Sequence, residues 1–207
     1  MTDCFALLQE PRRPWLDPEE LKQKFHSLSS KCHPDKFHTA STAEQKVAQQ
    51  EYAELNRAYQ RLREPKERLQ HLLELESGTK PGQVQSIPPG LMEISLQVAQ
   101  LCRQADGVTA EKSQTSSPLL QVQLFEKAQD CTEKLMGLQR QLKTRQEELL
   151  MQLRKLDAEW EKGCAEGTSI SPTRAALLVR LQELANLLGY FGRWTSQLQE
   201  RIVQLSF

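Results

Sequence analysis

Residues 31–37 read Lys-Cys-His-Pro-Asp-Lys-Phe, a short polar stretch between two segments with helical periodicity. On the N-terminal side, Asp17 and Pro18 suit the cap and the first position of a helix. Apolar residues then follow at intervals of three and four, which predicts a helix as far as Cys32. We expect the helix to break before Pro34, because proline disfavours helical geometry in the preceding residue. The sequence thus predicts two helices joined by a turn that presents the tripeptide His-Pro-Asp.

Helical periodicity continues on both sides of this unit. After the turn, apolar residues from Val47 to Leu62 lie on one helical face, and Thr42 begins a sequence similar to a capping box. Pro65 suits the first position of a shorter helix, and Asp3 precedes an apolar helix start. No alternating apolar and polar pattern is present, so we expect no strands. The N-terminal third therefore reads as a small helical domain built around the turn.

The charges of the chain are balanced. Lysine and arginine together number 27, as do aspartate and glutamate, so net charge predicts neither a nucleic acid nor a membrane partner. No apolar run approaches the roughly eighteen residues that would suggest a membrane span, and the N-terminus has no signal-peptide pattern. We expect a cytoplasmic protein, or one of the mitochondrial matrix if a transit peptide has been removed.

The five cysteines are far apart and include no Cys-x-x-Cys pair. This spacing argues against a disulfide framework and against a structural zinc site. A metal site built from His26, His33 and His38 would span a helix and a turn with no second cluster to complete it. We expect neither a metal nor another cofactor.

Glycine and proline divide the rest of the chain. Stretches with the composition of turns and linkers, at 77–90, 106–118 and 163–172, separate three segments whose apolar residues recur at intervals of three and four positions. Such helices bury their stripes against one another, so residues 91–207 are expected to form an antiparallel three-helix bundle. The predicted organisation is an all-α chain with an N-terminal domain at 1–76 and a linker at 77–90. The alternative is one long homodimeric coiled coil, which the breaks disfavour.

Some apolar residues lie outside the predicted seams of the bundle. Met92 and Leu96 form a pair four residues apart, and Leu187, Tyr190 and Trp194 form a stripe beside the seam of the last segment. These side chains either widen the core or form an exposed patch of the composition typical of partner sites. The sequence alone leaves both possibilities open.

An enzymatic role for the turn is also conceivable, with His33 and Asp35 as an acid–base pair. Pro34 separates the two residues rigidly, and nothing in the flanking sequence indicates a pocket. We therefore expect that the chain has no catalytic activity of its own.

The chain resembles the HscB-type J-proteins, co-chaperones of iron–sulfur cluster assembly, over nearly its whole length. The resemblance rests on residues 33–37, 56–65, 91–93 and 197–201. It also rests on the compact N-terminal domain, which has no Gly/Phe-rich region or zinc-binding cysteines and is joined directly to a helical bundle. The fold that it implies is a J-domain followed by a scaffold-binding bundle.

The resemblance implies two partners and no nucleic acid or membrane. The first is an HscA-like Hsp70, whose ATPase the turn and the basic face before it would stimulate. The implied Hsp70-binding residues are His33, Pro34, Asp35, Lys36, Lys22, Lys24 and Lys31. The second is an IscU-like iron–sulfur scaffold, bound by an apolar patch on the first and last bundle helices. The implied scaffold-binding residues are Leu91, Met92, Leu96, Leu187, Tyr190 and Phe191.

This sequence departs from the bacterial relatives in the charge of the first bundle helix. Those relatives carry several acids there, whereas here Glu93 is followed by Gln97, Gln100 and Arg103. Apolar contacts would therefore have to dominate scaffold binding. The alternative function is a generic J-protein or helical adaptor whose bundle carries another client or associates weakly with a second copy.

Overall fold

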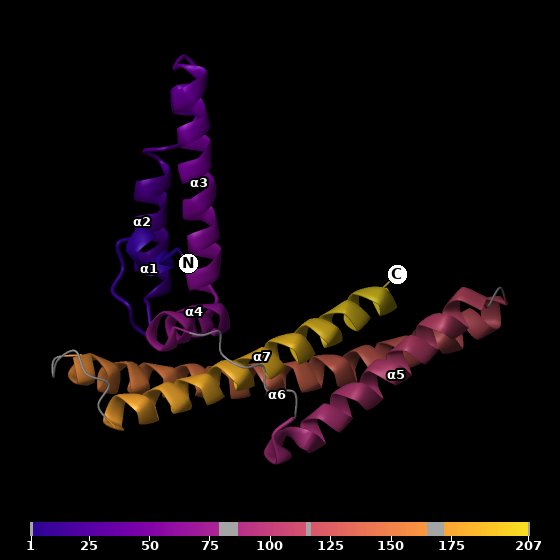
Figure 1. Ribbon diagram of the computed structural model, residues 1–207. Coiled ribbons are helices and arrows are strands. Elements are labelled where there is room, and N and C mark those ends of the chain that lie inside the picture. Colours follow the sequence, from indigo (N-terminus) through magenta and orange to yellow (C-terminus); the bar gives the residue numbers. More distant parts are fainter. Residues whose placement is uncertain (1, 79–86, 115–116, 165–171, 207) are drawn as a thin grey trace. The chain divides into compact units, whose positions relative to one another are not determined.

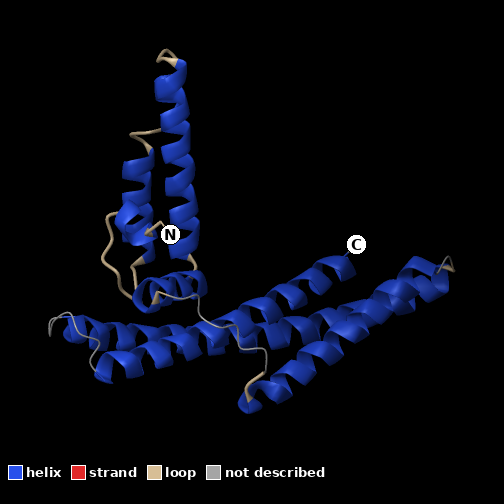
Figure 2. Cartoon of the chain, in the orientation of Figure 1, coloured by secondary structure: helices blue, strands red, loops and turns tan. Residues whose placement is uncertain are grey.

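The computed structural model describes residues 2–78, 87–114, 117–164 and 172–206. These residues form helices and connecting turns without any strand, which confirms the predicted all-α class (Figure 2). The elements are α1 (Cys4–Leu7), α2 (Pro18–Ser29), η1 (Pro34–Phe37), α3 (Thr42–Arg63), α4 (Pro65–Ser77), η2 (Pro89–Leu91), α5 (Met92–Gln114), α6 (Pro118–Cys164) and α7 (Pro172–Ser206). No helix within the described ranges has the length and apolar character needed to cross a membrane.

Helices α2 and α3 lie side by side and are joined through η1 (Figure 1). Phe25 of α2 stacks on Tyr59 of α3 with ring centroids 4.3 Å apart. As predicted, Asp17 caps α2, because its carboxylate accepts hydrogen bonds from the N–H groups of Glu19 and Glu20. The predicted capping box is present one residue earlier than expected, with Ser41 as the cap.

Helix α2 ends at Ser29, three residues before the predicted end at Cys32. The hydroxyl groups of Ser29 and Ser30 donate to the carbonyl oxygens of His26 and Ser27. Such side-chain bonds offer the backbone an alternative to continued helix. The apolar spacing still places Cys32 in the core, where it is buried.

Helix α4 closes the N-terminal part of the chain and contacts α3. The buried ring of His71 stacks on Phe5 of α1, and its Nε2 accepts a hydrogen bond from the N–H of Cys4 at 2.9 Å. Because Nε2 accepts this bond, the ring is neutral, and burial lowers the pKa of His71 from its ordinary value. A neutral histidine thus links the two ends of the N-terminal domain.

This histidine should make stability depend on pH. As pH falls below about 6.5, the unfolded chain takes up a proton that folded His71 still excludes, so the free energy of unfolding decreases. The decrease continues until the pH reaches the lowered pKa of the folded state. We expect His71→Gln to flatten this dependence in urea unfolding between pH 7 and pH 5. The exposed His26 provides the control: a His26→Gln variant that flattens it equally would contradict the assignment.

Helices α6 and α7 carry their predicted seams in the core, whereas in η2 and α5 only Val98 and Ala105 of the predicted seam are buried and Leu91, Ile94 and Leu101 are half-buried. In α6 the buried seam runs from Leu124 to Trp160, and in α7 from Leu177 to Leu205. Polar contacts along the flanks join α6 to α5 and α7 to α5. These contacts are Lys127 with Glu111 at 3.2 Å and Arg201 with Asp106 at 3.3 Å. Successive helices run in opposite directions, so the antiparallel arrangement is confirmed (Figure 1).

The prediction of a loose segment at 106–118 is wrong for most of its length, because α5 extends to Gln114. Polar composition and Gly107 suggested a loop, but tertiary contacts support the helix. Lys112 donates to the carbonyl oxygen of Leu205 at 3.1 Å, and Asp106 is held by Arg201. Most of the loose stretches predicted at 77–90 and 163–172 lie outside the described residues.

The chain forms two compact units, which do not follow the order of the sequence. One unit contains Met1–Gly82 and Met151–Asn186, and the other contains Gln83–Leu150 and Leu187–Phe207. Helices α6 and α7 each contribute to both. The predicted domain boundaries, 1–76 and 91–207, therefore stay a prediction. In the first unit, the N-terminal helices are grouped with the parts of α6 and α7 between Met151 and Asn186.

Candidate functional site

The His-Pro-Asp turn is held by its own backbone and by α3. His33 caps η1, with its Nδ1 accepting a hydrogen bond from the N–H of Asp35 at 3.3 Å. The His33 ring meets Tyr52 of α3 edge-on, with centroids 5.2 Å apart. Pro34 occupies the first position of η1, where its fixed φ suits the turn. The conformation of the turn is therefore fixed by a hydrogen bond within the turn, by an aromatic contact with α3 and by Pro34.

Asp35 is the group that this turn presents, since its side chain is 90% exposed. One of its carboxylate oxygens approaches Nδ1 of His33 to 3.6 Å. This distance is too long for a hydrogen bond between the two side chains. The negative charge of Asp35 thus remains available to a bidentate arginine of a partner.

The residues after the turn add further support. Nδ1 of His38 lies 2.8 Å from the carbonyl oxygen of Asp35. The Gln45 side chain donates to the carbonyl oxygens of His38 and Ala40 at 3.2 and 3.1 Å. The loop between η1 and α3 is therefore tied to the first turn of α3, and the backbone of the presented aspartate is tied to the loop.

The four predicted lysines differ in their surroundings. Lys22, Lys31 and Lys36 are exposed and make no ion pair within the described part of the chain. Lys24 instead pairs with Glu10 at 2.9 Å and donates to the carbonyl oxygen of Gln9 at 3.2 Å. Its charge is partly committed to the loop before α2, so three of the four cations remain for an acidic partner surface.

The predicted scaffold-binding residues separate into two groups. Met92 and Leu96 of α5 are 48% and 61% exposed, and Leu91 and Leu187 are half-buried. The expectation that Tyr190 and Phe191 form exposed surface is wrong: their exposures are 6% and 3%.

An aromatic cluster on α7 accounts for this difference. The ring of Trp194, itself buried, lies 5.8 Å from that of Tyr190 and 5.7 Å from that of Phe191. The guanidinium of Arg193 lies over Tyr190 at 4.9 Å. The off-seam stripe of the last helix therefore widens the core, whereas the off-seam pair on α5 forms surface.

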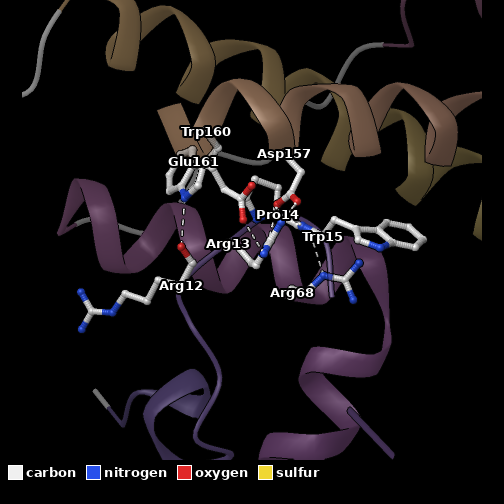
Figure 3. Close-up of polar contacts among 8 residues, drawn as sticks. All are labelled: Arg12, Arg13, Pro14, Trp15, Arg68, Asp157, Trp160 and Glu161. Carbon is white, nitrogen blue, oxygen red and sulfur yellow. Dashed lines mark hydrogen bonds and ion pairs between the residues drawn. The ribbon is translucent and has the colours of Figure 1, made fainter. Parts of the chain in front are cut away.

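A second polar cluster, within the first compact unit, joins the loop before α2 to α6. The Asp157 carboxylate is buried and forms an ion pair with Arg13, whose Nε lies 3.1 Å from both carboxylate oxygens (Figure 3). The same carboxylate accepts a hydrogen bond from the N–H of Trp15 at 3.0 Å. Arg13 also reaches the exposed Glu161 at 2.6 Å, and this second partner helps raise the arginine pKa, after the hydrogen bond to Asp157.

Aromatic and backbone contacts surround this ion pair. The indole N–H of Trp160 donates to the carbonyl oxygen of Arg12 at 2.9 Å. Trp15 has the guanidinium groups of Arg68 and Arg154 over its ring, at 5.8 and 4.2 Å. Arg68, in turn, donates to the carbonyl oxygen of Pro14 at 2.8 Å. We call the contacts of residues 12–15 with Asp157 and Trp160 the loop clasp.

The sequence patterns did not identify the loop clasp. Its only signals were a charged residue, Asp157, directly beside the apolar seam of α6 and a tryptophan within a Pro/Arg-rich loop. Neither pattern specifies a partner more than 140 positions away. The clasp became recognisable only when folding brought the loop onto α6.

Comparison with known proteins agrees with this geometry. Residues 3–71 match the DnaJ domain family. The chain is 43% identical over 72 residues to proteins described as co-chaperone protein HscB homologues in Bordetella pertussis and Bordetella parapertussis. The match covers 35% of this chain and 42% of each relative, so it spans less than half the length of these curated relatives.

Two solved structures share the fold over most of the chain. Chaperone HscB from Vibrio cholerae has a TM-score of 0.51 at 24% identity, covering 95% of this chain and 99% of that one. Human co-chaperone protein HscB has a TM-score of 0.59 at 18% identity, covering 98% of this chain and 81% of that one. The chain thus contains a DnaJ domain that carries the His-Pro-Asp turn, it is similar in that domain to HscB homologues, and it shares the all-helical fold of these two HscB structures.

Proposed function

We propose that this protein is a co-chaperone that brings an iron–sulfur cluster scaffold to a specialised Hsp70 and stimulates the ATPase of that Hsp70. The observation that carries the proposal is the braced His-Pro-Asp turn, with the Asp35 carboxylate 90% exposed and its backbone fixed on both sides. The likeness to HscB-type relatives in the DnaJ domain supports the choice of partner class.

The electrostatics of the turn suit a partner with an arginine beside an acidic surface. Asp35 would receive the arginine in a bidentate pair. Lys22, Lys31 and Lys36, which have no ion pair in the described chain, would face the acidic surface. Exposed lysines contribute little singly, so we assign them mainly to partner steering and orientation. His33 and Pro34 would act by fixing the carboxylate, and no bond of a substrate is broken by this chain.

The scaffold would bind to α5 through the exposed side chains of Met92 and Leu96, with the half-buried Leu91 and Leu187 at its margin. Exposed Met and Leu side chains four residues apart on a helix offer a small apolar surface of the kind found in partner sites. The two partners and the chain would meet in the compartment of cluster assembly, either the cytoplasm or the mitochondrial matrix.

One assay separates the two halves of this proposal. The full chain should accelerate single-turnover ATP hydrolysis by the Hsp70 of its source, and the scaffold should increase the acceleration further. The double variant Met92→Ala, Leu96→Ala should reduce the scaffold-dependent acceleration about tenfold or more. The scaffold-free acceleration should stay unchanged, because both side chains lie at the surface.

Val122 and Phe125 provide the matched control, since they are 60% and 67% exposed on α6. Replacing both with alanine should leave the scaffold effect unchanged. An equal loss in the two double variants would contradict the patch on α5. An Hsp70 response that never depends on the scaffold would instead favour a J-protein with another client.

A further inference from the structure

We propose that Gln45 is a positioning residue for Hsp70 stimulation: acting through His38, it holds the backbone of Asp35 in the conformation that presents the carboxylate. The inference rests on the proposed function. It assigns a part in that function to a side chain of α3, ten positions after the aspartate and outside both the His-Pro-Asp turn and the basic residues around it.

Burial does little to hold the segment around Asp35 in place. Within residues 34–41, all of which the structure describes, no side chain is buried. Such a segment gains little hydrophobic stabilisation to offset the conformational entropy that it loses when it is ordered. Its conformation therefore depends largely on hydrogen bonds to neighbours that are themselves fixed.

Gln45 supplies two of these hydrogen bonds from a fixed point. Its backbone N–H donates to the carbonyl oxygen of Ser41 at 2.9 Å, so its main chain belongs to the hydrogen-bonded helix. Its side-chain amide donates to the carbonyl oxygens of His38 and Ala40, at 3.2 and 3.1 Å. Because both neighbours are acceptors, the nitrogen of the amide must face them. The loop before α3 is thus tied to the helix by the donor group of one side chain.

His38 carries this connection on to Asp35. Its Nδ1 lies 2.8 Å from the carbonyl oxygen of Asp35, and Nδ1 carries the proton because a carbonyl oxygen only accepts. Gln45 therefore fixes the main chain of the histidine whose ring fixes the main chain of the aspartate. Next to this point, the N–H of Lys36 donates to the carbonyl oxygen of His33 at 3.0 Å. Two side chains in succession thus connect α3 to the residue that the turn presents.

Loss of this connection should weaken the affinity for Hsp70 and leave the stimulated rate unchanged. A loosened segment presents Asp35 correctly for only part of the time, and the apparent dissociation constant rises as the competent fraction falls. Once bound, the Hsp70 would still meet the same carboxylate and the same lysines. We therefore expect half-maximal stimulation to need a higher concentration of the chain, with the same maximal stimulation at saturation.

Gln45→Glu tests the two donated hydrogen bonds in the full chain. Glutamate has the shape of glutamine but no donor, so its carboxylate would face two carbonyl oxygens. An acid near the N-terminus of a helix interacts favourably with the helix dipole, so α3 should remain stable. In single-turnover ATP hydrolysis by the source Hsp70, we expect half-maximal stimulation at about a fivefold higher concentration, with an unchanged maximum. The free energy of unfolding in urea should not fall.

Gln49→Glu is the matched control. Gln49 is exposed on α3 one turn beyond Gln45, and its side chain makes no hydrogen bond to the described residues 38–41. The substitution adds the same charge to the same helix, and it should behave like the native chain. An equal rise in both variants would show that charge on α3 sets the affinity, which would overturn the proposal.

Hydrogen exchange of the Lys36 N–H reports the loosening directly, because that group donates to His33 inside the turn. Its exchange should accelerate in Gln45→Glu and stay unchanged in the control. Unchanged exchange in Gln45→Glu, or faster exchange with native half-maximal concentration, would contradict the positioning role. A lower maximum together with a lower free energy of unfolding would mean that Gln45 is only structural, and the proposal would be wrong.

Two variants of His38 keep the inference testable if Gln45→Glu does not fold. Asparagine carries an NH2 group at the same number of bonds from Cα as Nδ1 of histidine, whereas leucine has no donor. We expect His38→Asn to stay near the native chain and His38→Leu to need about a fivefold higher concentration. Equal behaviour of the two variants would contradict the inference. Failure of the proposed function itself would look different, because the native chain would then give no stimulation at any concentration.

Discussion

The His33→Gln variant is expected to lose Hsp70 stimulation while remaining folded. His33 contributes an acceptor to the Asp35 N–H and an edge-on ring contact to Tyr52, and glutamine reproduces neither with the same rigid geometry. The Asp35 carboxylate would then be presented in many orientations, and the oriented pairing with a partner arginine would be lost. Central interface residues typically contribute about 2 kcal/mol or more, which corresponds to a loss of roughly thirtyfold.

This prediction is checked by single-turnover ATP hydrolysis with the full chain. Asp35→Asn should give a loss of the same order, because it removes the presented charge without changing the shape of the side chain. His26→Gln is the matched control, since His26 lies exposed on α2 outside the turn. Circular dichroism should be unchanged in all three variants. Retained stimulation by His33→Gln would overturn the role assigned to the turn.

The largest effect on stability is expected for Arg68→Ala. This arginine is 3% exposed and donates to the carbonyl oxygens of Pro14 and Leu62, both at 2.8 Å. Burial lowers its pKa to about 10, partly offset by the charges of Asp157 and Glu64. Alanine would leave a cavity, two buried carbonyl groups without their donor and Trp15 without one of its cations. We expect a loss of about 3–5 kcal/mol in the free energy of unfolding.

Urea unfolding followed by circular dichroism measures this loss. Arg57→Ala is the control, because Arg57 is exposed on α3 and its side chain donates to the carbonyl of Ala53 within its own helix. The control should change the free energy of unfolding by less than about 0.5 kcal/mol. Equal effects of the two substitutions would mean that the buried hydrogen bonds of Arg68 do not stabilise the fold.

Local sequence signals predicted the elements that depend on neighbouring residues. Asp17 and Pro18 marked the start of α2, and Pro65 marked the start of α4. Gly78, with a φ of 68°, ends α4 in the left-handed conformation that glycine favours. Each of these signals acts within one turn of helix, so the residues concerned are close in sequence.

Features that depend on contacts between residues far apart in the sequence were predicted less well. The polar end of α5 resembled a loop because its supporting contacts come from Arg201 and from the backbone of Leu205, near the end of the chain. Tyr190 and Trp194 suited either core or surface by spacing alone. Their burial was decided by the width of the core and by mutual aromatic contact.

By itself, the sequence determined the helical class, the seams of the long helices and the turn at His33-Pro34-Asp35, because periodicity, caps and proline act locally. The tertiary structure alone decided which off-seam residues are surface, and it alone brought Asp157 to Arg13 and Trp15. A buried ion pair across 144 positions leaves no periodic trace in the sequence. Its partners are selected by packing, since only the folded chain removes both charges from water and places them within reach of each other.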